Sequence, residues 1–127
     1  MIARYPLIVH RVRKVPRQFS WVDQRLVREH RIAHCTAHGA AMYLFLVTVA
    51  DATGLSFYSD HSIAQHLSMD VADVIAARDN LIRADLIGFK KPLYQVLSIE
   101  DAPVGRSAMD RPLSLGDILK KAMEGRP

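Results

Sequence analysis

The most constraining feature of this 127-residue sequence is a series of short periodic segments between residues 59 and 99. Apolar residues recur there first at helical spacing and then in the pattern of short strands. The predicted elements are a short helix through Leu67 that Ser59 or Asp60 caps, a tight turn at Ser68–Asp70, a helix over Val71–Ala84, a strand at Leu86–Phe89, a turn at Lys90–Pro92 and a strand at Leu93–Ile99. In the longer helix we expect Val74, Ala77, Leu81 and Ile82 to face inward.

The remaining sequence divides into an arm, an N-terminal part of the domain and a C-terminal extension. Phe19, Val22, Leu26 and Val27 predict a first helix that ends near Ile32. Thr36 can cap a second helix over residues 37–50, which is apolar nearly all round and is therefore predicted to be buried. Residues 55–58 are expected to form a short extended piece. The predicted organisation is a basic arm at 1–18, a domain at 19–100, and a linker with a final helix at 101–127.

The excess positive charge is concentrated near the N-terminus. Residues 1–35 contain eight Lys or Arg residues and two acids, which gives +6, whereas the whole chain carries +4. An arginine-rich segment with this surplus is typical of a phosphate-contacting arm. The single cysteine, Cys35, and the absence of a long apolar run predict a cytoplasmic protein without membrane contact.

The segment from Tyr58 to Phe89 resembles the winged helix-turn-helix superfamily of bacterial DNA-binding proteins. The positions that match are Ile63, Ala64, Leu67, Val74, Ala77, Leu81, Leu86 and Ile87. The part with Phe19, Leu44 and Asp51–Gly54 looks like the N-terminal helices of winged-helix replication initiators and primosome proteins. The whole chain also looks like small helix-turn-helix proteins of bacterial mobile elements. The resemblance covers residues 19–99 and implies a mainly α winged helix-turn-helix fold with a small β-hairpin wing.

The function that this resemblance implies is binding of double-stranded DNA, as a transcriptional regulator or a replication or transposition accessory factor. Arginines and lysines of the arm are expected on phosphates or in a minor groove, polar residues of the second motif helix in the major groove, and two wing lysines on the flanking backbone. These residues are, in that order, Arg11, Arg13, Lys14 and Arg17; Arg78, Asn80 and Arg83; and Lys90 and Lys91. A homodimer is favoured, because such domains commonly bind two-fold sites and the final helix has a spare apolar stripe.

One property of the second motif helix favours a different function. Its N-terminal half presents Asp70, Val71, Asp73, Ile75 and Ala76, and carboxylates beside phosphates disfavour binding. The alternative is therefore a winged-helix adaptor that binds protein and has little affinity for DNA.

Two further side-chain groups have both a functional and a structural interpretation. His30, His34, Cys35 and His38 have metal-ligand chemistry, but their spacing matches no strong zinc pattern. We therefore expect no metal or cofactor, with a metal-responsive sensor as the weakest alternative. Phe57, Tyr58, Phe89, Tyr94 and Trp21 are able to stack on bases, yet packing in the core or wing is favoured for each, with Trp21 as an anchor of the first helix. No nucleophile, base and orienting group assemble, so catalysis is not expected.

Overall fold

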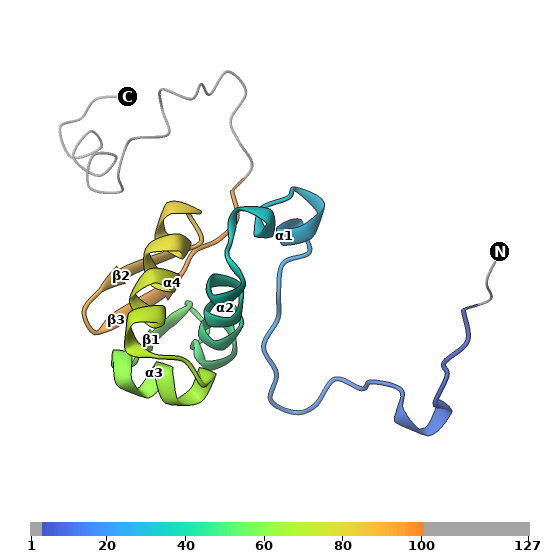
Figure 1. The fold of residues 1–127 in the computed structure, drawn as a ribbon. Coiled ribbons are helices and arrows are strands. Elements are labelled where there is room, and N and C mark those ends of the chain that lie inside the picture. Colours follow the sequence, from blue (N-terminus) through green and yellow to red (C-terminus); the bar gives the residue numbers. More distant parts are fainter. Residues whose placement is uncertain (1–3, 101–127) are drawn as a thin grey trace, which may run out of the picture.

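Four helices and a three-stranded antiparallel sheet form the body of the protein in the computed structural model, which describes residues 4–100 (Figure 1). The helices are α1 (Arg25–Arg28), α2 (Ala37–Val49), α3 (Asp60–Leu67) and α4 (Val71–Arg83), of which α1 is a single turn. The strands are β1 (Leu55–Phe57), β2 (Ile87–Lys90) and β3 (Leu93–Val96), and short 3-10 turns lie at Val9–Arg11 and Ile32–His34. Helix α4 packs against α2, α3 and β2.

The predicted starts of the helices from Thr36 onward are confirmed by the capping interactions, whereas α2 and α4 each end one residue earlier than predicted. The Thr36 hydroxyl accepts a hydrogen bond from the Gly39 N–H at 3.0 Å, which begins α2. The Ser59 hydroxyl accepts one from the Ser62 N–H at 3.1 Å, which begins α3. Ser68 has a left-handed backbone, with φ of 55°, and this conformation makes the tight turn between α3 and α4.

The sheet contains one strand more than the predicted hairpin. The short extended piece at residues 55–58 becomes β1, which pairs with β3 in the order β1-β3-β2. Ser56 lies opposite Tyr94, and Tyr94 in turn lies opposite Phe89 of β2. A segment of three residues is too short for the alternation of apolar and polar side chains to predict a strand. β1 forms because it pairs with β3, which is distant in the sequence.

The core lies where α2, α3 and α4 meet the inner face of the sheet. Its largest fully buried side chains are Tyr94, Met42, Leu46, Ile63, Leu81, Leu86 and Val74. The predicted burial of Val74, Ala77 and Leu81 is confirmed, but that of Ile82 is wrong, since its side chain is exposed. Ile82 follows Leu81 by about 100° around the helix, and this turns it away from α2 and the sheet. Leu44 is exposed as well, so α2 is not buried on every face.

The predicted first helix over residues 19–32 is wrong except for the single turn of α1. Only Leu26 is buried in this segment, whereas Phe19, Trp21 and Val22 are exposed. His30 then has φ of 59°, a left-handed conformation that ends the turn. A short helix needs packing to be stable, and here most apolar side chains face no partner. The predicted linker and final helix at 101–127 lie outside the described residues.

Candidate nucleic-acid interface

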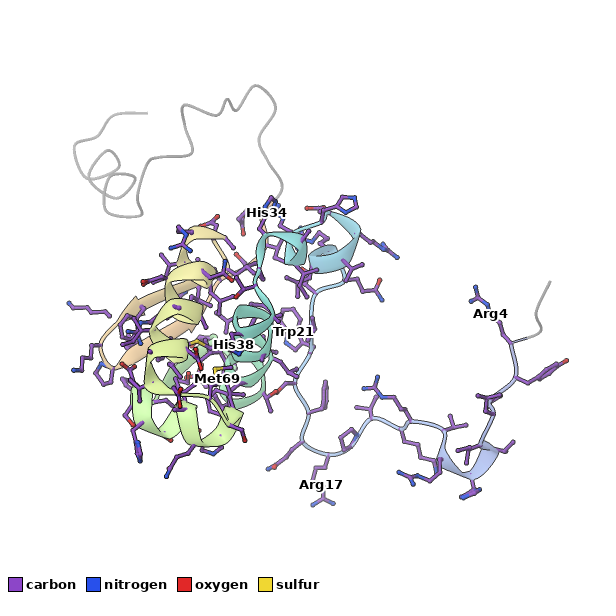
Figure 2. The ribbon with its side chains drawn as sticks, viewed as in Figure 1. Arg4, Arg17, Trp21, His34, His38 and Met69 are labelled. Carbon is purple, nitrogen blue, oxygen red and sulfur yellow. The ribbon has the colours of Figure 1, made fainter. Side chains whose placement is uncertain are left out.

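The described part of the arm, residues 4–18, carries cations that no other part of the described chain neutralises. Each of its residues is exposed, and the chain there is extended apart from the turn at Val9–Arg11. No ion pair or hydrogen bond joins the side chains of its five cations to another described residue; they are Arg4, Arg11, Arg13, Lys14 and Arg17. Figure 2 shows Arg4 and Arg17 projecting away from the helices. These groups are free to contact phosphates.

A second, smaller basic site lies at the turn between β2 and β3. Lys90 and Lys91 are both exposed there, and no ion pair with a described residue involves either one. The hairpin beneath them is held by four paired positions and by the fully buried ring of Tyr94. A rigid hairpin thus presents two ammonium groups at its tip.

The outer face of α4 is mainly apolar. The residues exposed on it are Val71, Ala72, Ile75, Ala76, Asp79, Ile82 and Arg83. At its N-terminus Asp70 and Asp73 form a capping box, in which the Asp73 carboxylate accepts a hydrogen bond from the Asp70 N–H at 3.2 Å. The carboxylates at this end therefore stabilise the helix start. Arg83 is the one exposed arginine or lysine that the described helix offers.

Arg78 is placed inside the fold and not on the outer face of α4. Its side chain is 12% exposed, and its Nη1 lies 2.6 Å from Asp60 Oδ1 and 3.0 Å from the Tyr94 hydroxyl. The guanidinium also lies over the Phe89 ring, 4.3 Å from its centroid. Burial lowers the pKa of Arg78, but its hydrogen bonds to Tyr94 and Asp60 outweigh that and raise the pKa above its ordinary value. This arginine joins α3, α4 and the hairpin, so it does not serve as the expected base-contacting donor.

Asn80 is likewise buried, and its amide connects α4 to the start of α2. The Oδ1 atom accepts hydrogen bonds from the Thr36 N–H at 2.8 Å and the Thr36 hydroxyl at 3.3 Å. The Nδ2 group donates to the His34 carbonyl at 3.1 Å. The expected major-groove position of Asn80 is therefore incompatible with this structure. Of the three residues predicted for the groove, Arg83 alone is exposed.

Replacing Arg78 with alanine is expected to lower the free energy of unfolding by about 2 kcal/mol. The change leaves the buried Tyr94 hydroxyl and the partly buried Asp60 carboxylate without the described donor. Urea unfolding followed by circular dichroism measures the loss. Arg83→Ala on the same helix is the matched control, with an expected effect within about 0.5 kcal/mol. Equal stability of the two variants would contradict the structural role of Arg78.

The histidines and the cysteine of the possible metal cluster are not brought together. No group of three or more metal-binding side chains occurs in residues 4–100. The left-handed residue His30 and the extended Cys35 interrupt the chain, so the ring nitrogens do not share one helix face. His38 instead lies 3.9 Å from the carboxylate of Asp73, and burial raises the pKa of the Cys35 thiol. The metal-sensor hypothesis therefore has no support in this part of the chain.

A pocket that the sequence did not predict lies beside the end of the arm. It has a volume of about 610 Å³ and is bounded by the segment after the arm, by α2, by the loop before β1 and by the end of β3. Trp21, expected as a core anchor, is instead exposed at this pocket. Tyr43 of α2 also lines it and was not singled out by any sequence motif. The sequence alone does not show whether a tyrosine in an apolar helix lines a pocket or lies in the core.

Comparisons of the chain with protein-family models, with curated proteins and with solved structures found no match. Within residues 4–100, no helix combines the length and apolar character needed to cross a membrane.

Proposed function

We propose that this chain is a DNA-binding winged-helix protein, a transcriptional regulator or a replication or transposition accessory factor of a bacterial mobile element. The observation that carries the proposal is the arm, whose five cations have no partner among the described residues. The order of α2, β1, α3, α4 and the β2–β3 hairpin agrees with a winged helix, in which α4 is the recognition helix and the hairpin is the wing.

The arm and the wing would supply most of the binding free energy through phosphate contacts. Figure 1 shows the arm leaving past α1 and α2, on the side away from the β2–β3 turn. An extended chain reaches about 3.3 Å per residue, so the arm can follow a backbone well beyond the folded body. Phosphate contacts at two separated places fix the orientation of the protein on a duplex.

Base reading by α4 would be weak. Its exposed face offers Arg83 as a donor, and the methyl groups of Val71, Ile75 and Ile82 are suited to contacts with thymine methyls alone. Arg78 and Asn80 are not part of the proposed interface, because their side chains are used within the fold. The expected behaviour is salt-dependent binding with little sequence preference.

The test is fluorescence anisotropy of a labelled duplex of random sequence, titrated with the full chain at several salt concentrations. The affinity should fall steeply with salt, and Lys90→Ala with Lys91→Ala should reduce the slope of log K against log salt by up to about 2. The matched control changes both lysines to arginine and should keep the native slope. Absence of binding at low salt would contradict the proposal.

The second candidate function is the protein-binding adaptor, which the apolar outer face of α4 favours. An exposed helix face of this composition is suited to packing against a partner. Such an adaptor would show a nearly flat salt dependence or no binding in the same titration. Pairing of two copies through the final helix stays a prediction, because that segment lies outside the described residues.

A further inference from the structure

The first feature of the pocket beside the arm is a pair of exposed aromatic side chains. Two aromatic side chains, Phe19 and Trp21, line it and remain 64% and 73% exposed. Ser20 between them is tied to α2 by a hydrogen bond from its hydroxyl to the Thr48 carbonyl, at 3.1 Å. This bond holds the segment against the helix, and Figure 2 shows Trp21 where the segment passes α2. The segment that carries the two exposed rings is thus joined to α2.

Tyr43 supplies an unused polar group to the same pocket. The residue is 7% exposed, and its hydroxyl makes no hydrogen bond within the described residues. Burial raises the pKa of Tyr43, and the nearby carboxylate of Asp23 raises it further, so the phenol stays protonated at neutral pH. A protonated hydroxyl can both donate and accept, which is the property needed to bind a polar edge of a ligand.

The Asp23 carboxylate at the wall is already neutralised. Arg25 Nη2 lies 2.7 Å from Asp23 Oδ2, and hydrogen bonds from Arg25 hold the pKa of Asp23 below its ordinary value. Asp51 also lines the pocket; its carboxylate accepts hydrogen bonds from the N–H groups of Leu55 and Thr53, which lower its pKa and keep it ionised. The pocket itself therefore suits an uncharged group better than an anionic one. Positive charge is available immediately before it in the chain, at Arg17 and Lys14 of the arm.

We propose that this pocket and its two aromatic rings bind unpaired bases of single-stranded nucleic acid, while the arm binds the phosphates of the same strand. The inference rests on the proposed function and adds the substrate class. Unpaired bases offer free faces that stack on aromatic rings, whereas the bases of a duplex are stacked on one another. Phe19 and Trp21 act as stacking platforms, and the Tyr43 hydroxyl contacts the edge of a base inside the pocket.

The volume and the charge distribution agree with this ligand. Ligand pockets in proteins range from roughly 300 to 1,000 Å³, and the pocket falls within that range. The arm supplies the cations at one end of the pocket, so a strand can place its phosphates on the arm and its bases at the rings. A free aromatic effector would need the rings but not the arm.

Trp21 is the single tryptophan of the chain, so its fluorescence reports directly on the pocket. The experiment titrates the full chain with single-stranded oligothymidine or oligouridine of about 20 nucleotides and with a duplex of the same length. We expect both single strands to quench the fluorescence and to bind roughly 10-fold more tightly than the duplex at equal salt. Tighter binding of oligothymidine would indicate DNA as the ligand, and tighter binding of oligouridine would indicate RNA.

Two variants separate stacking from folding. Trp21→Ala should weaken single-strand binding roughly 10-fold and leave duplex binding unchanged, while Trp21→Phe should retain most of the affinity. Binding by these variants is followed by anisotropy of a labelled strand. Tyr43→Phe keeps the ring and removes only the hydroxyl, so it should lower single-strand affinity several-fold with an unchanged unfolding curve.

The outcomes distinguish this inference from the proposed function. Salt-dependent duplex binding without Trp21 quenching by single strands would overturn the pocket assignment and leave the proposed function standing. Native single-strand affinity in Trp21→Ala would overturn it as well, and would leave a free effector or another part of the chain as the occupant. Absence of binding to every nucleic acid would overturn both.

Discussion

Replacing Arg11, Arg13, Lys14 and Arg17 with alanine is expected to remove most of the affinity for DNA. If each residue contacts one phosphate, the slope of log K against log salt should fall by about 3 to 4. This change corresponds to a loss of about 100- to 1000-fold in affinity at physiological salt. Anisotropy titrations at several salt concentrations measure both quantities for the variant and the native protein.

The arm variant is informative because its fold should be unaffected. All four side chains are exposed and none is paired with another described residue, so the free energy of unfolding should change by less than about 0.5 kcal/mol. A matched variant with Arg11, Arg13 and Arg17 changed to lysine keeps the charge and should keep the slope. A quadruple alanine variant with the native slope would remove the arm from the interface.

The second large effect is expected for Asn80→Ala, which should lower the free energy of unfolding by about 2 to 4 kcal/mol. The buried amide satisfies the Thr36 N–H and the His34 carbonyl, and both groups lose a partner when it is removed. Urea unfolding measures the loss. The control is Asp79→Ala, an exposed neighbour on the same helix, which should change stability by less than about 0.5 kcal/mol. Equal stability of the two would contradict the proposed role of the amide.

Gly39 provides a double-mutant test of the same contact. A Cβ atom at this position would clash with Asn80 Oδ1, so Gly39→Ala alone should destabilise the protein by about 1 to 3 kcal/mol. In the Asn80→Ala background the obstructing oxygen is gone and the Thr36 hydroxyl, 3.2 Å from the added Cβ, is the tight contact that remains, so most of the cost should vanish. The double variant should therefore lose clearly less stability than the sum of the two single losses. Additive losses would show that the two residues do not meet.

The helices from residue 37 onward and the hairpin were predictable because their signals are local. Thr36 and Ser59 are capping residues at the required positions, and Val74, Ala77 and Leu81 repeat at the spacing of one helix face. The helix expected over residues 19–32 was wrong because a local pattern does not show whether the fold supplies a surface for the helix to pack against. Its apolar residues have helical spacing, but the fold offers no surface to cover Phe19, Trp21 and Val22.

The candidate site was only partly predictable. The exposure of the arm and the hairpin tip agrees with the sequence, since charged side chains beside prolines or in a turn are rarely buried. The sequence does not distinguish Arg78 and Asn80 from Arg83, because all three are polar residues of one helix. The exposure of the three side chains differs because the fold places Asp60 and Tyr94 next to Arg78 and the start of α2 next to Asn80.

The amino-acid sequence by itself therefore determined the order of the helices, their caps, the hairpin and the concentration of positive charge in the arm. Each of these depends on residues close together in the chain. Only the tertiary structure decided which polar groups of α4 are buried, that β1 joins the sheet, and that Trp21 and Tyr43 share a pocket. Those outcomes depend on contacts between residues that are distant in the sequence. The physical reason for the buried side chains of α4 is that a buried polar group needs a hydrogen-bond partner, and only the fold decides where that partner lies.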